Sequence, residues 1–460
     1  MKKSIGINTL FEIVARILNF IITIVISRFF GAGVLGTISS AQAISAYVTL
    51  FGDFGTSNEA IRSIASDKKN ATDNVNLIYT YRFAFTGLLF IILFLLVTFD
   101  VVTNFVLIAF IVVALMNLFI PNFLFIGLKE FKFNGYLSLI NTGIAFILFI
   151  IGVTVFKDYH SLPIALIIAT SITILFSLTI IRKRNYHFSF PSYKEIKSFL
   201  LRSYYIGATT VFGRIYYDFD IVILALLTTQ ESVGLYSASF KIIQILWFIP
   251  QMYVTFALPI VTSLINENEE KLKLFINNVL LIVLLFNSII IFIAIGYSEE
   301  ILITLFGEEF SHGSTVLFIL LIAYSFQLLK IIFGNALIAF KEEKYLLKLS
   351  IMGTSVNVIS NFALIPMIGI LGAAISTAIT ELILLILEAR KTYEAVQFKI
   401  DYLNVSKLLI SLITTVIFSF YLQLSMMIEL PMLVLVFLLL LFALKENAVL
   451  WVKKYLGERV

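Results

Sequence analysis

The feature that most constrains this chain is a recurrence of long apolar segments that contain no charged residue. A helix needs about 20 apolar residues to cross the roughly 30 Å hydrocarbon core of a bilayer. Outer-membrane strands are shorter and alternate apolar with polar residues, a pattern that is absent here. The chain is therefore predicted to be an all-α, polytopic membrane protein. The charge-free segments are residues 83–99, 101–128, 133–156, 161–181, 242–265, 274–298, 349–380 and 408–428.

Composition supports this class and excludes several kinds of chemistry. The residues are 60% hydrophobic and 13% charged, whereas soluble domains have near a quarter charged residues. The absence of cysteine excludes disulfides and iron–sulfur ligation. No phosphate-binding loop of the form GxxxxGK[ST] occurs, and the GxGxxG at residues 31–36 follows a span rather than a strand. The three histidines have no ligand spacing, so neither a catalytic nor a metal site is predicted.

Hydropathy, together with the charged and turn-forming residues between apolar runs, predicts about fourteen membrane spans. The first twelve form two lobes of six spans each, and the last two form an appendage. The predicted spans are residues 7–29, 39–60, 77–99, 103–127, 136–156, 161–181, 204–228, 235–264, 274–297, 313–340, 346–366, 370–390, 405–425 and 430–445.

The distribution of Lys and Arg sets the predicted orientation, because basic residues in short loops resist translocation. With Met1 on the cytoplasmic side, most of the 33 basic residues fall in cytoplasmic segments. Only Arg28 and Lys157 fall in outer loops. Both termini are therefore predicted to be cytoplasmic.

The two predicted lobes resemble each other in sequence. Residues 36–44 (GTISSAQAI) align with residues 234–242 (GLYSASFKI), and the same shift places Arg16 on Arg214. Because each lobe contains an even number of spans, the two copies should share one orientation in the membrane, as parallel repeats do in several transporter folds. The predicted domains are an N-terminal lobe at 1–181, a cytoplasmic linker at 182–203, a C-terminal lobe at 204–390, and the last spans with a cytoplasmic tail at 391–460.

The cytoplasmic linker carries the longest basic stretch of the chain. Within it, Ser192 and Glu195 have the spacing of a capping box, which predicts a short amphipathic helix before the seventh span. Attraction of this helix to anionic lipids is the simpler interpretation. A specific role in substrate binding is the alternative.

The stretch FGRIYYDFDIVILALLTT, residues 212–229, places three charges at the start of an otherwise apolar run. A charged side chain in the middle of a bilayer costs about 2.5–3.5 kcal/mol and normally faces a bundle interior or a wet cavity. Arg214 and Asp218 are four residues apart on one helix face, so they are predicted to pair. Asp220 points elsewhere and has no partner within its own helix.

The first lobe carries an equivalent pair, Glu12 and Arg16, in its first span. Any one buried charge can serve only to fix helix packing, but the cations together exceed what bundle assembly requires. We therefore expect a cavity between the lobes that is rich in cations and suited to an anionic substrate such as a phosphate. The other members of this predicted set are Asp53, Glu59, Arg82, Lys241, Lys330 and Glu381.

Four segments carry a resemblance to a known family. They are residues 26–65 (ISRFFGAGVLGTISSAQAISAYVTLFGDFGTSNEAIRSIA), the VGLYSAS stretch from Val233, the FGEEF stretch from Phe306, and residues 361–381 (NFALIPMIGILGAAISTAITE). Their order and spacing over nearly the whole chain resemble the polysaccharide (O-antigen, Wzx-type) flippases of the multidrug/oligosaccharidyl-lipid/polysaccharide (MOP) exporter superfamily.

The resemblance implies a transporter rather than an enzyme. Its implied substrate is an undecaprenyl-pyrophosphate-linked oligosaccharide, moved by alternating access from the cytoplasmic to the outer leaflet of a bacterial plasma membrane for surface polysaccharide biosynthesis. The implied partners are this lipid-linked oligosaccharide, membrane lipids, a polysaccharide polymerase and glycosyltransferases, with no role for nucleic acid. No cofactor is implied beyond a coupling ion, H⁺ or Na⁺.

Under this resemblance the cations are expected to neutralise the pyrophosphate, and the carboxylates are candidates for ion or proton coupling. The expected pyrophosphate and glycan contacts are Arg16, Arg214, Lys241, Arg82, Arg62 and Lys330. The coupling candidates are Glu12, Asp53, Asp218, Asp220 and Glu381.

Three other interpretations remain open. A multidrug or cation antiporter of the same superfamily shares the two-lobed plan, but its cavity should be rich in acid, and the excess of base here opposes it. A peptidoglycan-precursor flippase also handles a lipid pyrophosphate, and the sequence discriminates poorly against it. A non-transporting scaffold of a glycan-assembly complex predicts that removing the cavity charges is harmless.

Overall fold

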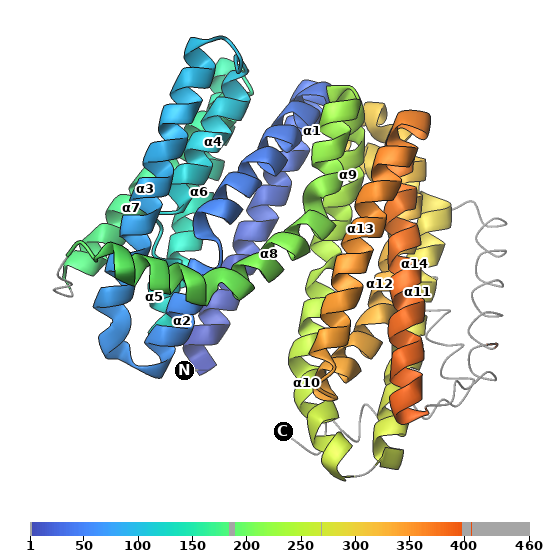
Figure 1. The fold of residues 1–460 in the computed structure, drawn as a ribbon. Coiled ribbons are helices and arrows are strands. Elements are labelled where there is room, and N and C mark those ends of the chain that lie inside the picture. The colour runs from blue at the N-terminus through green and yellow to red at the C-terminus, as the bar shows by residue number, and fades with distance from the viewer. Residues whose placement is uncertain (1, 184–188, 268, 398–405, 407–460) are drawn as a thin grey trace. The chain divides into compact units, whose positions relative to one another are not determined.

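The computed structural model describes residues 2–183, 189–267, 269–397 and 406, and over these residues it contains helices and no strands (Figure 1). A helix pairs its backbone N–H and C=O groups internally, which the hydrocarbon of a membrane demands. The predicted all-α class is therefore confirmed. The helices are α1 (Lys2–Asp53), α2 (Thr56–Ser66), α3 (Ala71–Thr98), α4 (Phe105–Asn117), α5 (Asn122–Gly127), α6 (Phe131–Phe156), α7 (Ser161–Arg182), α8 (Tyr193–Leu227), α9 (Gln230–Leu246), α10 (Phe248–Glu267), α11 (Glu269–Phe306), α12 (Ser314–Ala339), α13 (Glu343–Ile368) and α14 (Ile370–Val396), with short 3₁₀ turns η1 (Lys68–Asn70) and η2 (Glu308–Gly313).

Ten helical segments among the described residues are long and apolar enough to cross a membrane. The first of them, Gly6–Asp53, covers the predicted span 7–29 and the predicted span 39–60 up to residue 53. The predicted span 204–228 lies within α8, which is not among the ten because its charged residues interrupt the apolar run. Apart from residue 406, the predicted spans 405–425 and 430–445 lie outside the described residues, as does most of the predicted segment 391–460. The number of fourteen therefore stays a prediction.

Two glycines with positive φ shape the first helices. Gly31 (φ 77°) kinks α1, and Gly55 (φ 76°) separates α1 from α2, in a backbone region that glycine enters without steric cost. The predicted second span, 39–60, was wrong at its end, because the chain turns after Asp53 and begins a separate helix. Glu59 consequently lies on α2 rather than inside a span.

The contacts divide the chain into two compact units, Met1–Ser237 and Ala238–Val460. In the first unit α1 packs against α4 and α6, and α6 packs against α7. Helix α8, which the sequence places in the C-terminal lobe, groups with the first unit and contacts both α1 and α2. Figure 1 shows α8 running across α1–α7 rather than along them. The capping box predicted at its start is confirmed, with Ser192 and Glu195 bonding each other reciprocally.

Within the first unit, two glycines that the sequence alignment pairs also meet in space. A Cβ on Gly36 of α1 would lie 1.7 Å from the Gln230 carbonyl oxygen, and a Cβ on Gly234 of α9 would lie 1.9 Å from the Ala32 carbonyl oxygen. The shift that aligns Gly36 with Gly234 also aligns Ala32 with Gln230, so each contact is the repeat counterpart of the other. Glycine is needed at both positions, because any side chain would collide with the other backbone.

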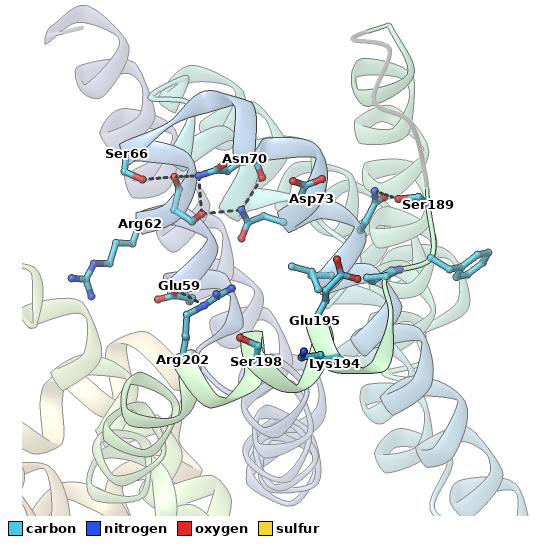
Figure 2. A pocket seen from close by; sticks show the side chains of 16 residues that line it. Glu59, Arg62, Ser66, Asn70, Asp73, Ser189, Lys194, Glu195, Ser198 and Arg202 are labelled. Atoms are coloured by element: carbon cyan, nitrogen blue, oxygen red, sulfur yellow. Dashed lines mark hydrogen bonds and ion pairs between the residues drawn. The ribbon is translucent and has the colours of Figure 1, made fainter.

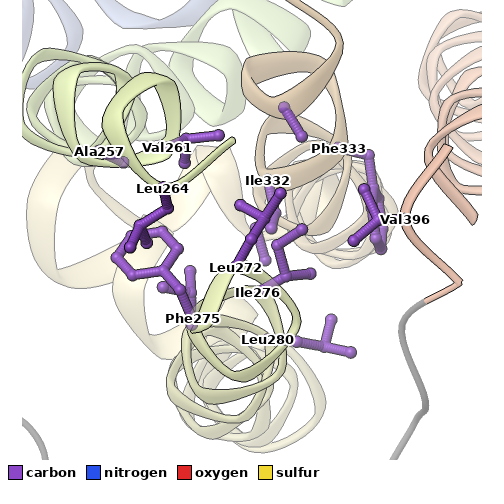
Figure 3. Close-up of a cluster of buried hydrophobic side chains, with 12 residues drawn as sticks. Ala257, Val261, Leu264, Leu272, Phe275, Ile276, Leu280, Ile332, Phe333 and Val396 are labelled. Carbon is purple, nitrogen blue, oxygen red and sulfur yellow. The ribbon is translucent and has the colours of Figure 1, made fainter. Parts of the chain in front are cut away.

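The second unit is held by an apolar cluster that joins four helices (Figure 3). Leu264 of α10, Phe275 of α11 and Phe333 of α12 belong to it, together with Val396 at the end of α14. A hydrogen bond from Thr392 Oγ1 to the Phe333 carbonyl, 3.3 Å, adds a polar contact between α12 and α14. This packing holds α14, which carries Glu381 and Glu388, against α12, which carries Lys330.

Candidate functional site

The stretch at residues 212–229 forms the charged part of α8. Arg214 Nη2 pairs with Asp218 Oδ2, as the spacing predicts, and the Arg214 side chain keeps 45% of its surface exposed. Asp220 is buried, and its Oδ2 accepts a 3.1 Å hydrogen bond from the Tyr236 hydroxyl of α9. This partner was not predicted, because Tyr236 is on the next helix and the contact is not one of helical spacing. The Arg214 side chain is thus about half exposed, and the neighbouring carboxylates of Asp218 and Asp220 each have a partner.

The predicted pair between Glu12 and Arg16 is not formed. Glu12 Oε1 instead accepts hydrogen bonds from Asn8 Nδ2 at 3.0 Å and from Asn134 Nδ2 of α6 at 3.4 Å. Arg16 is exposed and makes no ion pair with any described residue. A side chain from a packed neighbouring helix has taken the place of the predicted partner, and Arg16 is left open.

Arg82 of α3 is buried, with only 3% of its side chain exposed. Its Nη2 contacts Asp53 Oδ1 and lies 2.7 Å from Ser57 Oγ, while its Nη1 donates to the Leu118 carbonyl. These contacts tie α3 to α1, α2 and the end of α4. The structure therefore places Arg82 and Asp53 in a helix-packing contact, and we do not include Arg82 among the proposed substrate contacts.

The second unit contains a buried group of charges on α12 and α14. Lys330 Nζ lies 2.6 Å from Glu381 Oε2, and both side chains are largely buried. Glu388, two turns further along the same face of α14, is only 8% exposed and lies against Gly334 of α12. Glu388 was not among the predicted site residues, because it lies near the end of the predicted span 370–390. Lys241 of α9 is part-buried and does have an interaction, so it is not a free cation.

Arg62 borders a polar pocket of about 980 Å³ in the first unit (Figure 2). The pocket lies between α2, the start of α3, and the segment that leads into α8. Arg202 of α8 closes one side through a 3.5 Å ion pair with Glu59. Arg62 and Glu59 were among the predicted site residues, but their meeting with Asp73, Lys194 and the other lining residues was not predicted, since polar residues in separate segments give no sign that they meet.

These features define a class. Many apolar helices of membrane-crossing length, a few charged pairs held between them, and open cations on otherwise apolar helices are typical of a polytopic transporter, because charges at membrane depth are kept mainly where they serve a pathway.

A family model described as "Polysaccharide biosynthesis protein" matches residues 1–265, and the chain belongs to this family. In Haloferax volcanii, a protein named probable low-salt glycan biosynthesis flippase Agl15 is 28% identical over 218 residues. The match covers 46% of this chain and 45% of that protein, so it extends over less than half of the curated relative.

Two solved structures have a similar fold. The lipid II flippase MurJ in an inward closed conformation has a TM-score of 0.70 at 15% identity, covering 94% of this chain and 97% of that one. An inward-facing multidrug resistance MATE family transporter of the MOP superfamily has a TM-score of 0.61 at 16% identity, covering 85% and 94%. The predicted polysaccharide family is therefore confirmed by the family match, and these two structures show that the fold is shared. The relatives found are flippases and transporters rather than enzymes.

Proposed function

We propose that this protein is a flippase that moves an undecaprenyl-pyrophosphate-linked oligosaccharide across a bacterial plasma membrane for surface polysaccharide biosynthesis. The observation that carries the proposal is the family match over residues 1–265. That region includes Arg16, Arg62 and Arg214. The name of the Haloferax volcanii relative supports a glycan substrate. Both termini face the cytoplasm in this proposal, and the lobes alternate access to the two leaflets.

We assign contact with the pyrophosphate to Arg16 and Arg214, with Lys241 as a further candidate. Both arginines retain exposed guanidinium groups, and a guanidinium binds phosphate oxygens through two parallel hydrogen bonds. Lys330 is less suited to this role, because it is buried against Glu381. The sugars occupy the wet side of the cavity, and the polyprenyl tail stays in lipid.

The most direct test is removal of the gene. Loss of the protein should deplete surface polysaccharide while lipid-linked repeat units accumulate in the cytoplasmic leaflet, measured by extraction and mass spectrometry of the lipid-linked pool. Growth arrest with accumulation of peptidoglycan precursor would favour the alternative flippase. An unchanged surface polymer and an unchanged lipid-linked pool would rule out transport of this substrate.

We propose that the buried charges of the second unit couple transport to an ion, with H⁺ at Glu388 as the first choice. Lys330 offers one positive charge to two buried carboxylates, Glu381 and Glu388. A second ionised carboxylate in a low-dielectric interior is strongly unfavourable, so it should take up a proton or a cation. Loss of that ion alters the charge between α12 and α14, which pack closely together.

Glu388→Gln should leave the protein folded and remove the response of transport to a pH gradient, because the amide mimics a permanently protonated carboxyl group. The measurement is flipping of lipid-linked oligosaccharide in proteoliposomes with and without an imposed gradient. Glu394→Gln is the matched control, since Glu394 is on the same helix but exposed and paired with Arg390 at 3.4 Å. A full gradient response in Glu388→Gln would place the coupling elsewhere.

A further inference from the structure

The lining of the polar pocket in the first unit does not include Arg214, the half-exposed arginine of α8. Its lining comes from three places: α2, the turn and first residues of α3, and the segment from residue 189 into α8. With a volume of about 980 Å³ it is in the upper range for pockets that bury a small organic ligand. The distribution of basic residues predicts that all three of these segments lie on the cytoplasmic side.

Hydrogen bonds between the pocket's own side chains fix much of its wall. Asn74 Nδ2 donates to Ser63 Oγ at 3.0 Å and to the Asn70 carbonyl at 2.7 Å. Asn76 Nδ2 donates to Ser189 Oγ at 2.9 Å, which ties the start of α3 to the segment before α8. The helices that line the pocket also share an apolar cluster, in which the fully buried Phe199 of α8 packs with residues of α2 and α3. The pocket is thus a built feature, with walls set by both polar and apolar packing.

Several groups in this pocket remain available to a ligand. Among the described residues, Asp73, Lys194 and Ser198 have neither a hydrogen-bond nor an ion-pair partner through their side chains, and Arg62 at the edge is likewise open. Glu195 uses Oε2 for both of its contacts with Ser192, each at 2.7 Å. Those contacts lower the pKa of Glu195, so its carboxylate is ionised at neutral pH and Oε1 is free to accept. Figure 2 shows Asp73 and Glu195 on opposite walls.

The charge balance indicates what kind of ligand fits. The lining contains three cations, Arg62, Lys194 and Arg202, and three carboxylates, Glu59, Asp73 and Glu195. The available carboxylates of Asp73 and Glu195 would repel a polyanion such as pyrophosphate, so its binding free energy here would be small. A sugar presents many hydroxyl groups that both donate and accept, and it suits a neutral pocket in which carboxylates, amides and cations alternate.

We propose that this pocket binds the sugar portion of the lipid-linked glycan on the cytoplasmic side before translocation. The proposal rests on the proposed function for the identity of the glycan. Asp73 and Glu195 accept hydrogen bonds from sugar hydroxyls, Lys194 and Arg62 donate to sugar oxygens, and Ser198 does either. The pocket is then a point at which the protein distinguishes one repeat unit from another, separate from the arginines that hold the phosphates.

The absence of native cysteine makes a direct test possible. Ser198→Cys places one thiol in the pocket, and Lys197→Cys places one on the neighbouring exposed position of α8, outside the lining. The probe is the oligosaccharide released by mild acid from the host's own lipid-linked pool, free of phosphate. It should slow maleimide labelling of the purified full-length Ser198→Cys protein and leave Lys197→Cys unaffected.

Asp73→Asn in the Ser198→Cys background should raise the sugar concentration needed for protection by about tenfold, since a hydrogen bond to an ionised carboxylate is stronger than one to a neutral amide. Glu195→Gln should act similarly while keeping the helix start, because Gln also completes a capping box. Protection by inorganic pyrophosphate alone, equal protection of both cysteines, or no protection by the oligosaccharide would each overturn the proposal.

The labelling result and the gene-removal result separate the two proposals. If removal of the gene leaves the surface polymer unchanged while the oligosaccharide protects Ser198→Cys, the pocket is a sugar site and the flippase assignment fails. If removal depletes the polymer while labelling is unaffected by sugar, the flippase assignment stands and the pocket proposal fails.

Discussion

Arg214→Ala should abolish surface glycan while the protein remains inserted in the membrane. The open guanidinium of Arg214 can donate to a pyrophosphate without leaving its helix, and charged hydrogen bonds of this kind contribute about 1.5–3 kcal/mol each, or about ten- to a hundredfold in affinity. Arg214→Lys should be milder, because it keeps the charge but loses the two-pronged geometry. The measurements are surface glycan by immunoblot and protein content of the membrane fraction.

A loss of glycan in Arg214→Ala has to be separated from a folding defect, because the change leaves Asp218 without its partner. The double variant Arg214→Ala with Asp218→Asn removes that unpaired charge. If binding is lost, the double variant stays inactive; if folding is lost, it recovers. Arg390→Ala, which removes an exposed arginine paired within α14, should have no effect. Normal surface glycan from a membrane-localised Arg214→Ala protein would exclude Arg214 from the site.

Asp53→Asn should destabilise the protein strongly, by up to about 3–5 kcal/mol, because it leaves the Arg82 charge buried without its carboxylate. The check is the thermal unfolding of purified protein, followed by the loss of its monodisperse peak in size-exclusion chromatography. Glu59→Gln breaks the more exposed pair with Arg202 and should cost less than about 1 kcal/mol.

A second variant distinguishes packing from substrate binding at this position. Replacing both partners of a buried ion pair by neutral residues of similar size is often close to neutral in stability. Arg82→Met combined with Asp53→Asn should therefore recover most of the stability, and with it export, if Arg82 serves helix packing. Recovery of stability without export would return Arg82 to the set of substrate contacts.

The ion pairs show where prediction from spacing succeeds and where it stops. Arg214 and Asp218 are neighbours on one helix face, so their pairing needs no knowledge of other helices. Glu12 and Arg16 have the same spacing, yet Asn134 arrives from α6 and binds Glu12 instead. The sequence therefore specifies which residues are able to pair, and the neighbouring helix decides whether they do.

The burial of a charged side chain is also decided by the neighbouring helices rather than by its spacing in the sequence. Arg82 and Arg214 look similar along the sequence, since each is a single cation within a predicted span. Only the packing of α3 against α1, α2 and the end of α4 surrounds Arg82 with acceptors, whereas α8 leaves Arg214 half exposed. Glu388 was missed for the converse reason, because a residue near a predicted span end gives no sign that α12 will cover it.

The sequence by itself determined the all-helical membrane class, the capping box that starts α8, the internal repeat and the family resemblance. These features depend on local periodicity, on the hydrocarbon's demand for internally paired backbone, and on residue order. Only the tertiary structure decided which charges are buried in helix contacts, which remain open, and that α2, α3 and the segment before α8 enclose one polar pocket. Such outcomes depend on contacts between residues far apart in the chain, whose partners no local pattern encodes.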